Sequence, residues 1–371
     1  MGQSRASVSL RLIRPHLGQL LVAGFTGDRL PVELRAVARE CGIGGLLIAP
    51  HNARDVLQVA DLARDAQTLA RDVPVWVARH PSTRLTVPPF ATWPPLVTLG
   101  RADDEVLTLD FAREHARQML ALGVSLDFLP ALDLPGRGTM AGPGGDADTL
   151  STDAGVVARH GARIIEGLQH TGLAACATHF PGIGDAQADG AITVPLLDAP
   201  PDHFEAVTWT PFRAAIEADV SAMLVSHVLA PGLDEAAPAA RSRGVVYDTL
   251  RHRLGFAGAV FADDLDALSS PSTDEGTHIG VLSLGAGCDV LVQGSGDIDR
   301  VASTLEAIIK AAEREDLAVA RLENALQRHE AMKAAFLSNA ARRMRPPHPT
   351  LERMLASGEQ ERVVARMQES L

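Results

Sequence analysis

The sequence contains little cysteine, almost no lysine and no long apolar run. Its three cysteines, Cys41, Cys176 and Cys288, are odd in number and sit in apolar runs without C-x-x-C spacing. This pattern predicts buried free thiols in a reducing compartment and argues against a disulfide framework or a cysteine–histidine metal cluster. No segment approaches the roughly 20 apolar residues that a membrane-spanning helix requires.

The charge balance is acidic, with 34 basic against 46 acidic residues and a formal net charge of −12. No general basic surface is therefore present to release counterions from a nucleic acid. The short apolar stretch that follows Arg14 lacks a small-x-small cleavage site, and we interpret it as a first buried strand instead of a signal peptide. The sequence predicts a cytoplasmic protein with neither a membrane nor a nucleic acid as partner.

Short apolar runs alternate with longer segments of helical periodicity. The runs are continuous, which is typical of parallel strands covered on both faces. Eight strands separated by helices fit a (β/α)8 barrel, although an open doubly wound sheet has the same local pattern. No G-x-G-x-x-G follows the first run, which disfavours a dinucleotide cofactor, and we expect none. The expected strands are residues 20–25, 45–49, 75–78, 126–132, 173–177, 222–228, 259–261 and 290–293, and the clearest helices are 103–122, 152–170, 204–217 and 298–312.

The C-terminal part of the chain has a different character. A breaker containing Pro346 and Pro347 precedes an amphipathic segment, residues 350–371. We therefore expect a barrel over residues 1–335 and a helical tail over residues 336–371. The tail would pack on the barrel or on a partner, and in the second case it would form a homo-oligomer.

In parallel barrels the chemistry lies where strands end, at their C-terminal face. Asp263 and Asp264 end one apolar run, where two adjacent carboxylates are costly unless they are paired, hydrogen-bonded or functional. The alternative is that one caps the next helix and the other is solvated. His179 begins a Gly/Pro-rich loop, His227 follows another run, and Asp133 ends a fourth. Each of these also has a structural alternative, as a hydrogen-bonded turn residue or a loop cap.

Taken in order, these motifs resemble glycoside hydrolase family 3, and in particular its single-barrel β-N-acetylglucosaminidase branch. The resemblance begins at Leu17 and extends to about Gln293. It implies a single barrel that hydrolyses the glycosidic bond of a carbohydrate substrate. The motifs that carry it are Gly123-Val124, Asp127-Phe128, Pro130-Ala131-Leu132-Asp133, His179-Phe180-Pro181-Gly182, Ser226-His227, Leu254-Gly255-Phe256-Ala257-Gly258, Asp263-Asp264-Leu265 and Gly285-Ala286-Gly287-Cys288-Asp289.

The resemblance also implies roles for single residues. Asp263 matches the nucleophile of the family's retaining mechanism, in which a carboxylate forms a glycosyl-enzyme that water then hydrolyses. In this branch the loop after the His-Phe-Pro-Gly motif carries an Asp-Ser-His sequence, in which Asp and His form a catalytic dyad. The Asp of this sequence matches Asp189. Its Ser and its acid/base His fall on Gly190 and Ala191, so the usual acid is absent. The remaining matches imply substrate binding by five residues, namely His179, His227, Arg137, Asp133 and Asp264.

Other family positions differ as well. A substrate-binding Lys is replaced by Thr178, the second His of H-F-P-G-H-G by Ile183, and the Asp-x-Glu-Gly-Gly motif by residues 78–84. We expect a glycosidase of altered or weakened activity whose acid comes from another residue, with His80, His179, Asp185 and Asp189 as candidates. A non-catalytic barrel that binds a sugar or a protein is the alternative. A third hypothesis, a barrel enzyme of another reaction class, has no supporting motif in the sequence. We also expect the loop 182–193 to be mobile.

Overall fold

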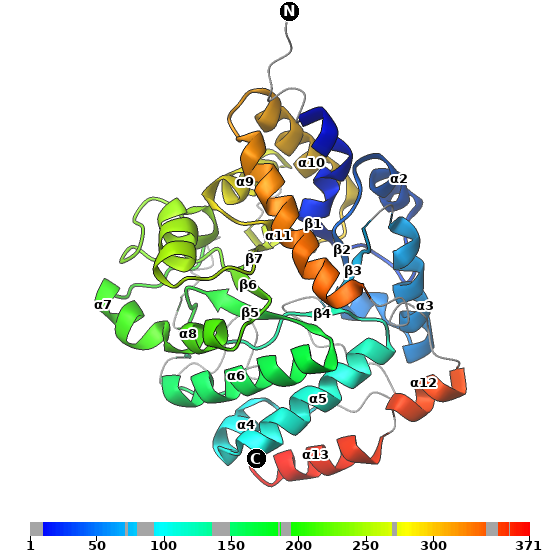
Figure 1. Cartoon of the computed structure of the whole chain (residues 1–371), viewed down its shortest axis with the longest axis vertical. Coiled ribbons are helices and arrows are strands. Elements are labelled where there is room, and N and C mark those ends of the chain that lie inside the picture. Colours follow the sequence, from blue (N-terminus) through cyan, green and yellow to red (C-terminus); the bar gives the residue numbers. More distant parts are fainter. Residues whose placement is uncertain are drawn as a thin grey trace, which may run out of the picture.

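The chain forms a closed barrel of eight parallel strands surrounded by helices (Figure 1). Strands β1 to β8 are neighbours in chain order, and β8 pairs back with β1. This confirms the (β/α)8 barrel and excludes the open sheet. The computed structural model describes residues 10–70, 73–79, 93–135, 149–184, 186, 194–268, 273–338, 348–355 and 357–371.

Eight strands and the main helices follow one another along the chain. The strands are β1 Leu21–Ala23, β2 Gly45–Ile48, β3 Trp76–Arg79, β4 Leu126–Asp127, β5 Ala174–Phe180, β6 Ala222–Val225, β7 Ala259–Asp264 and β8 Val290–Gln293. The helices are α2 Val32–Cys41, α3 Val56–Ala66, α4 Val97–Ala102, α5 Glu105–Ala121, α6 Ala154–Thr171, α7 Pro201–His203, α8 Thr210–Glu217, α9 Thr273–Ala286, α10 Ile298–Glu313, α11 Val319–Leu337, α12 His348–Leu355 and α13 Gly358–Gln368.

Most predicted elements differ from the observed ones by a few residues at an end, and two are interrupted in segments that contain a proline. The run 126–132 is a strand only over Leu126–Asp127, and Pro130, which has no N–H to donate, precedes an isolated bridge between Ala131 and Thr178. The expected helix 204–217 is a π-helical turn followed by α8, with Pro211 in the first turn of α8.

Helices α5, α6 and α10 begin at aspartates that precede them in the sequence. Asp104, Asp153 and Asp297 each accept hydrogen bonds from two backbone N–H groups of the first turn. Such caps satisfy donors that have no partner within the helix. Helix α6 ends at Gly172, whose φ of 101° lies in the region that favours glycine.

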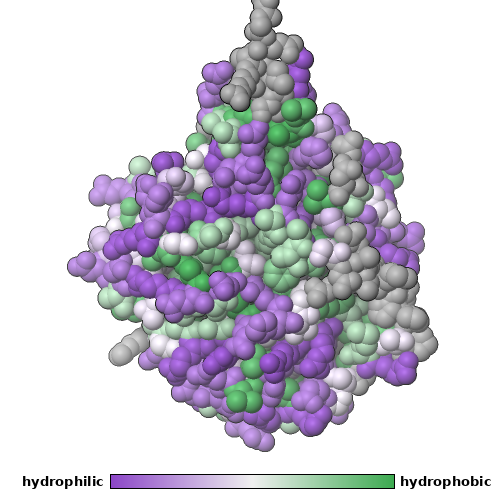
Figure 2. All heavy atoms as spheres, viewed as in Figure 1, coloured by the Kyte–Doolittle hydropathy of each residue, from purple (hydrophilic) through white to green (hydrophobic). Residues whose placement is uncertain are grey.

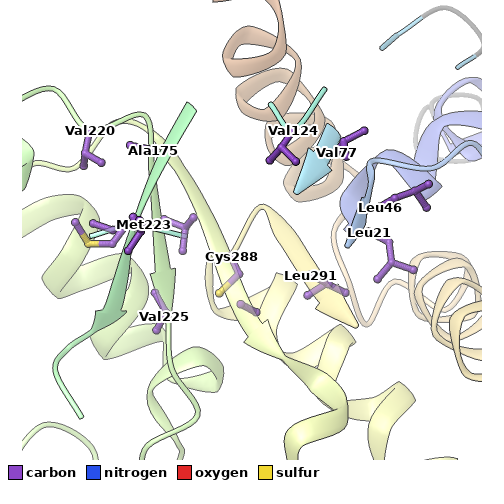
Figure 3. Packing of buried hydrophobic residues seen from close by; sticks show 14 of the residues in the cluster. Leu21, Leu46, Val77, Val124, Ala175, Val220, Met223, Val225, Cys288 and Leu291 are labelled. Carbon is purple, nitrogen blue, oxygen red and sulfur yellow. The ribbon is translucent and has the colours of Figure 1, made fainter. Parts of the chain in front are cut away.

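Alternate residues of each strand build two apolar layers. One set points into the barrel, and the other packs against the helices, as Leu21, Leu46, Val77, Met223 and Leu291 do in Figure 3. This period of two follows from the pleat of a strand. The interior layer contains Val22, Leu47, Trp76, Ala78, Leu126, Phe128, Ala174, Cys176, Ala222, Leu224, Ala259, Phe261, Val290 and Val292, together with Met332 and Leu337 of α11.

Helix α11 closes the N-terminal end of the barrel (Figure 1, orange). The buried His329 takes a hydrogen bond from Trp76 Nε1 at 2.7 Å, so its Nδ1–H donates to the carbonyl of Gln19, also at 2.7 Å. The buried Lys333 donates to Gln19 Oε1 at 2.6 Å and to the carbonyl of Gly44 at 2.7 Å. Burial holds the pKa of Lys333 well below its usual range. These bonds tie α11 to the segments that precede β1 and β2.

Replacing Lys333 with alanine should destabilise the protein by about 3 kcal/mol or more. The change loses two buried hydrogen bonds at about 0.5–1.5 kcal/mol each, and it removes the packing of a long buried side chain, a loss worth about 2–5 kcal/mol. Urea unfolding measures the effect as a lower midpoint at an unchanged slope.

The other lysine of the sequence provides the control. Lys310 is exposed and pairs with Glu306 one helical turn away, so Lys310→Ala should cost at most about 0.5 kcal/mol. Equal midpoints for the two variants would contradict the structural role of Lys333.

The C-terminal helices α12 and α13 lie along α5 (Figure 1). Ser357 at the start of α13 hydrogen-bonds to the buried Glu114 of α5, and Arg366 forms ion pairs with Asp104 and Asp110. Helix α11 runs through the expected boundary at residue 335, so its last turn belongs to the same element that closes the barrel. The contacts of the tail in this single chain are therefore with the barrel's own helices.

The surface carries hydrophilic residues over most of the face in Figure 2, with hydrophobic ones scattered among them. Within the described ranges, no helix combines the length and the apolar character needed to cross a membrane. All three cysteines are free thiols, as predicted, but only Cys176 and Cys288 are buried. Cys41 is partly exposed because it ends α2 at the helix surface, which corrects the expectation that it is buried.

Candidate active site

Asp263 lies at the C-terminal end of β7, opposite to the end that α11 closes. Ala259 and Phe261 point into the barrel, while Val260 and Ala262 pack against the helices. The period of two therefore places Asp263 on the inner side, where its side chain is partly exposed. The register between β7 and β8 shifts at this residue, between Ala262 and Asp264. Irregularities of this kind re-aim side chains and are frequent beside active sites.

The two adjacent carboxylates differ in their hydrogen bonds. Asp263 Oδ1 accepts the N–H of Asp264 at 2.8 Å. Asp264 Oδ1 accepts the N–H groups of Gly294 at 2.8 Å and Asp266 at 3.0 Å, which ties β7 to the end of β8. Asp264 thus binds backbone N–H groups, as expected if one of the two aspartates is a structural cap. In contrast, Asp263 Oδ2 makes no hydrogen bond with the described part of the chain.

His227 follows β6 and contacts the next strand. Its Nε2 lies 3.0 Å from the backbone oxygen of Asp263. The ring is buried, and its burial is the largest cause of a lowered pKa, opposed by the nearby carboxylate of Asp263. The structure thus brings together two of the predicted site residues, Asp263 and His227.

His179 forms a second pair with Asp133. The imidazole Nδ1 lies 2.7 Å from Asp133 Oδ2, and the other oxygen of Asp133 accepts the N–H of Ile183 at 2.9 Å. The neighbouring Thr178, which replaces the family's lysine, is buried and joins β5 to the segment after β4 through its backbone. Asp133 therefore fixes both the histidine ring and the start of the loop that follows it.

The family motif Asp127-Phe128 contributes to a third polar group, for which the sequence predicted no role. Asp127 of β4 is fully buried between Arg79, whose Nε donates to it at 2.7 Å, and His115 Nε2, also at 2.7 Å. Burial alone would raise the pKa of Asp127, but Arg79 and His115 together lower it to about 2. The available signal was a charged residue within an apolar strand, and a histidine one turn after Phe111 on the buried face of α5.

The Asp127 carboxylate should make the stability of the protein depend on acid pH. Its pKa is about 2 in the folded chain against 3.8 for an ordinary carboxyl, as in the unfolded chain, so the stabilisation is complete above about pH 4 and is lost as the pH falls through 2. Asp127→Asn should lower stability at pH 7, because it removes the buried negative charge that pairs with Arg79 Nε. The free energy of unfolding, measured from pH 5 to pH 2, should fall less steeply in the variant, and equal slopes would contradict this assignment.

The Cys176 thiol lies in the barrel interior near Asp263 and Asp127. Burial raises its pKa well above the usual range, and the charges of the two aspartates raise it further. The thiol is therefore protonated and unreactive at neutral pH. It forms an apolar part of the barrel interior near the candidate nucleophile.

Several predicted site residues lie outside the described residues. They are the expected catalytic Asp189 and substrate-binding Arg137, the alternative acids His80 and Asp185, and Gly190 and Ala191. The expectation of mobility falls mostly on the same part of the chain, since only 182–184 and 186 of that loop are described. Within the described ranges, no group of three or more His, Cys, Asp or Glu residues could hold a metal ion.

A surface hollow of about 600 Å³ lies between α6 and α8, away from the barrel mouth. Its arginines, Arg159 and Arg163, form ion pairs with Glu105 and with other acids beside it. Its lining also includes alanines of the two helices, Ala158, Ala162 and Ala214. The hollow therefore has none of the residues that the sequence marks for catalysis.

Comparison with known proteins agrees with the geometry. The model of the "Glycosyl hydrolase family 3 N terminal domain" matches residues 12–331. The chain is 30% identical over 296 residues to a "Beta-hexosaminidase" of Aromatoleum aromaticum, covering 76% of this chain and 80% of that protein. It is 31% identical over 297 residues to one of Xanthomonas euvesicatoria, covering 78% and 87%.

A solved structure supports the same relationship. The glycoside hydrolase family 3 β-N-acetylglucosaminidase from a Paenibacillus species superposes with a TM-score of 0.82 at 27% identity, over 96% of this chain and 68% of that one. The barrel and the matched length are thus those of one family. The chain belongs to glycosyl hydrolase family 3, in its single-barrel branch.

Proposed function

We propose that this family 3 glycoside hydrolase is a retaining β-N-acetylhexosaminidase of weakened activity, with Asp263 as its nucleophile. The proposal rests on the position of Asp263 at the inner edge of the barrel mouth, with Oδ1 held by the N–H of Asp264. A carboxylate there can attack an anomeric carbon and form a glycosyl-enzyme. The β-hexosaminidase names of the relatives support the sugar class.

The expected weakness has a chemical cause. General acid–base assistance is worth roughly 10²–10⁴-fold, and the residue that matches the family's acid is Ala191. Thr178 cannot supply the charged contact of the lysine that it replaces, and each such contact is worth about 1.5–3 kcal/mol. We keep Asp189 as the residue that assists proton transfer, and His179, Asp133, Arg137 and Asp264 as sugar ligands.

The proposal also covers the compartment and the partners of the protein. Three free thiols suit a reducing cytoplasm, where disulfides are rare. The contacts of α13 with α5 support a tail that packs on its own barrel. The only partner that the proposal requires is a carbohydrate.

Covalent trapping tests the proposal directly. A fluorinated N-acetylhexosaminyl donor with a good leaving group should form a glycosyl-enzyme that accumulates, because fluorine slows its hydrolysis. Intact mass should rise by one glycosyl unit, and peptide mapping should place it on Asp263. In parallel, a screen of nitrophenyl glycosides should find turnover with retained anomeric configuration.

Two results would count against the proposal. Label on another carboxylate would reject Asp263 as the nucleophile. Absence of both label and turnover on every glycoside, with sugar or protein binding intact, would support the non-catalytic barrel instead.

A further inference from the structure

His227 is placed to hold the residue that bears the nucleophile. Its Nε2 lies 3.0 Å from the backbone oxygen of Asp263 and the ring is 4% exposed. A carbonyl oxygen only accepts hydrogen bonds, so Nε2 carries the proton and donates it. The contact lies just beyond the end of the β6–β7 ladder, whose last pair is Val225 with Ala262. His227 thus supplies a donor where the sheet no longer does.

The charge state of His227 follows from its surroundings. Burial lowers its pKa most, and Arg241 lowers it further, while Asp263 and Asp264 act in the opposite direction. The net pKa is below the usual value, so the ring is neutral at pH 7. A neutral ring with its proton on Nε2 has an unprotonated Nδ1. This Nδ1 is buried and accepts no hydrogen bond from the described residues.

We infer that His227 is a positioning residue for Asp263. It holds the backbone of the nucleophile through Nε2–H and does not touch the reacting atoms. Together with the N–H of Asp264 on Oδ1, it fixes Asp263 from two sides and leaves Oδ2 for the attack. This goes beyond the sugar-binding role that the resemblance implies for His227, and its catalytic part rests on the proposed function of Asp263.

Three substitutions separate positioning from general packing. In His227→Gln, the amide nitrogen reaches about as far as Nε2 and can still donate to Asp263. In His227→Asn, the amide is too short, and His227→Leu fills the space without a donor. A misplacement of about 1 Å at a reacting group costs on the order of 10²-fold.

The rate of glycosyl-enzyme formation and the steady-state constants on a nitrophenyl glycoside provide the first readout. We expect His227→Leu and His227→Asn to lower kcat by about 100-fold with KM within about twofold, and His227→Gln to regain at least about a tenth of the wild-type rate. Thermal unfolding verifies that each variant is folded. If wild type is labelled on Asp263 and the Leu variant is labelled equally fast, the positioning role is rejected while the proposed function stands.

A second readout needs no activity. In ¹⁵N-histidine-labelled protein, the resonances lost in His227→Gln identify the ring, and their chemical shifts report which nitrogen carries the proton. We expect a neutral ring protonated at Nε2 at pH 7. An imidazolium ring, or a proton on Nδ1, would overturn the inference whether or not the enzyme turns over.

Discussion

Asp263→Asn should reduce hydrolysis of activated aryl glycosides by at least about 10⁴-fold, since loss of a nucleophile in a hydrolase costs on the order of 10⁶-fold. The amide has the shape of the carboxylate, and its oxygen can still accept the N–H of Asp264. It lacks the negative charge that attacks the anomeric carbon. Initial rates on a nitrophenyl N-acetylhexosaminide, with folding checked by thermal unfolding, measure the loss.

The neighbouring carboxylate is the matched control. Asp264 binds two backbone N–H groups, so Asp264→Asn should change stability or KM much more than kcat. It should also still allow label to accumulate on Asp263. A loss of kcat in Asp264→Asn as large as in Asp263→Asn would contradict the assignment of the nucleophile.

Restoring the family's acid should raise activity on a natural substrate by about 10²–10⁴-fold. The change is Gly190→Ser together with Ala191→His, which recreates the Asp-Ser-His order after Asp189. A sugar alkoxide needs a proton in order to leave, whereas a nitrophenolate is stable as an anion. The gain should therefore appear on an N-acetylated disaccharide and be small on a nitrophenyl glycoside.

The comparison of wild type and variant on the two substrates is the measurement. The single change Gly190→Ser, which adds the serine without the acid, is its control and should leave both rates near wild type. Efficient cleavage of the disaccharide by wild type would show that another acid acts already. The candidates would then be His179, held by Asp133 Oδ2, and the other three acids expected from the sequence, His80, Asp185 and Asp189.

The barrel was predictable because its signal is redundant. Eight apolar runs alternate with helical segments, so an error in one leaves the order of the others unchanged, and β8 was predicted at its observed bounds. The interruptions at Pro130 and Pro211 were harder to place, because apolar periodicity continues through them. A proline has no N–H to donate, and this local effect does not show in the apolar pattern.

For the candidate site, the sequence predicted which residues lie at the ends of strands and no more. Position after a strand selects Asp263 and His227, but no spacing predicts that a ring nitrogen of His227 meets a backbone oxygen. The group of Arg79, Asp127 and His115 joins two strands and a helix, and its contacts depend on the closed barrel. Side-chain partners across neighbouring elements therefore became visible only in the structure.

The helix that closes the barrel also sets an order for its folding during synthesis. Lys333 and its acceptor on Gln19 are 314 residues apart, which corresponds to roughly 15–60 s of translation at about 5–20 residues per second. During that time the first strands exist without the helix that covers their N-terminal ends. Their apolar interior, including Trp76, then remains accessible to chaperones and to other nascent chains. Slow codons before α11 would lengthen this exposure.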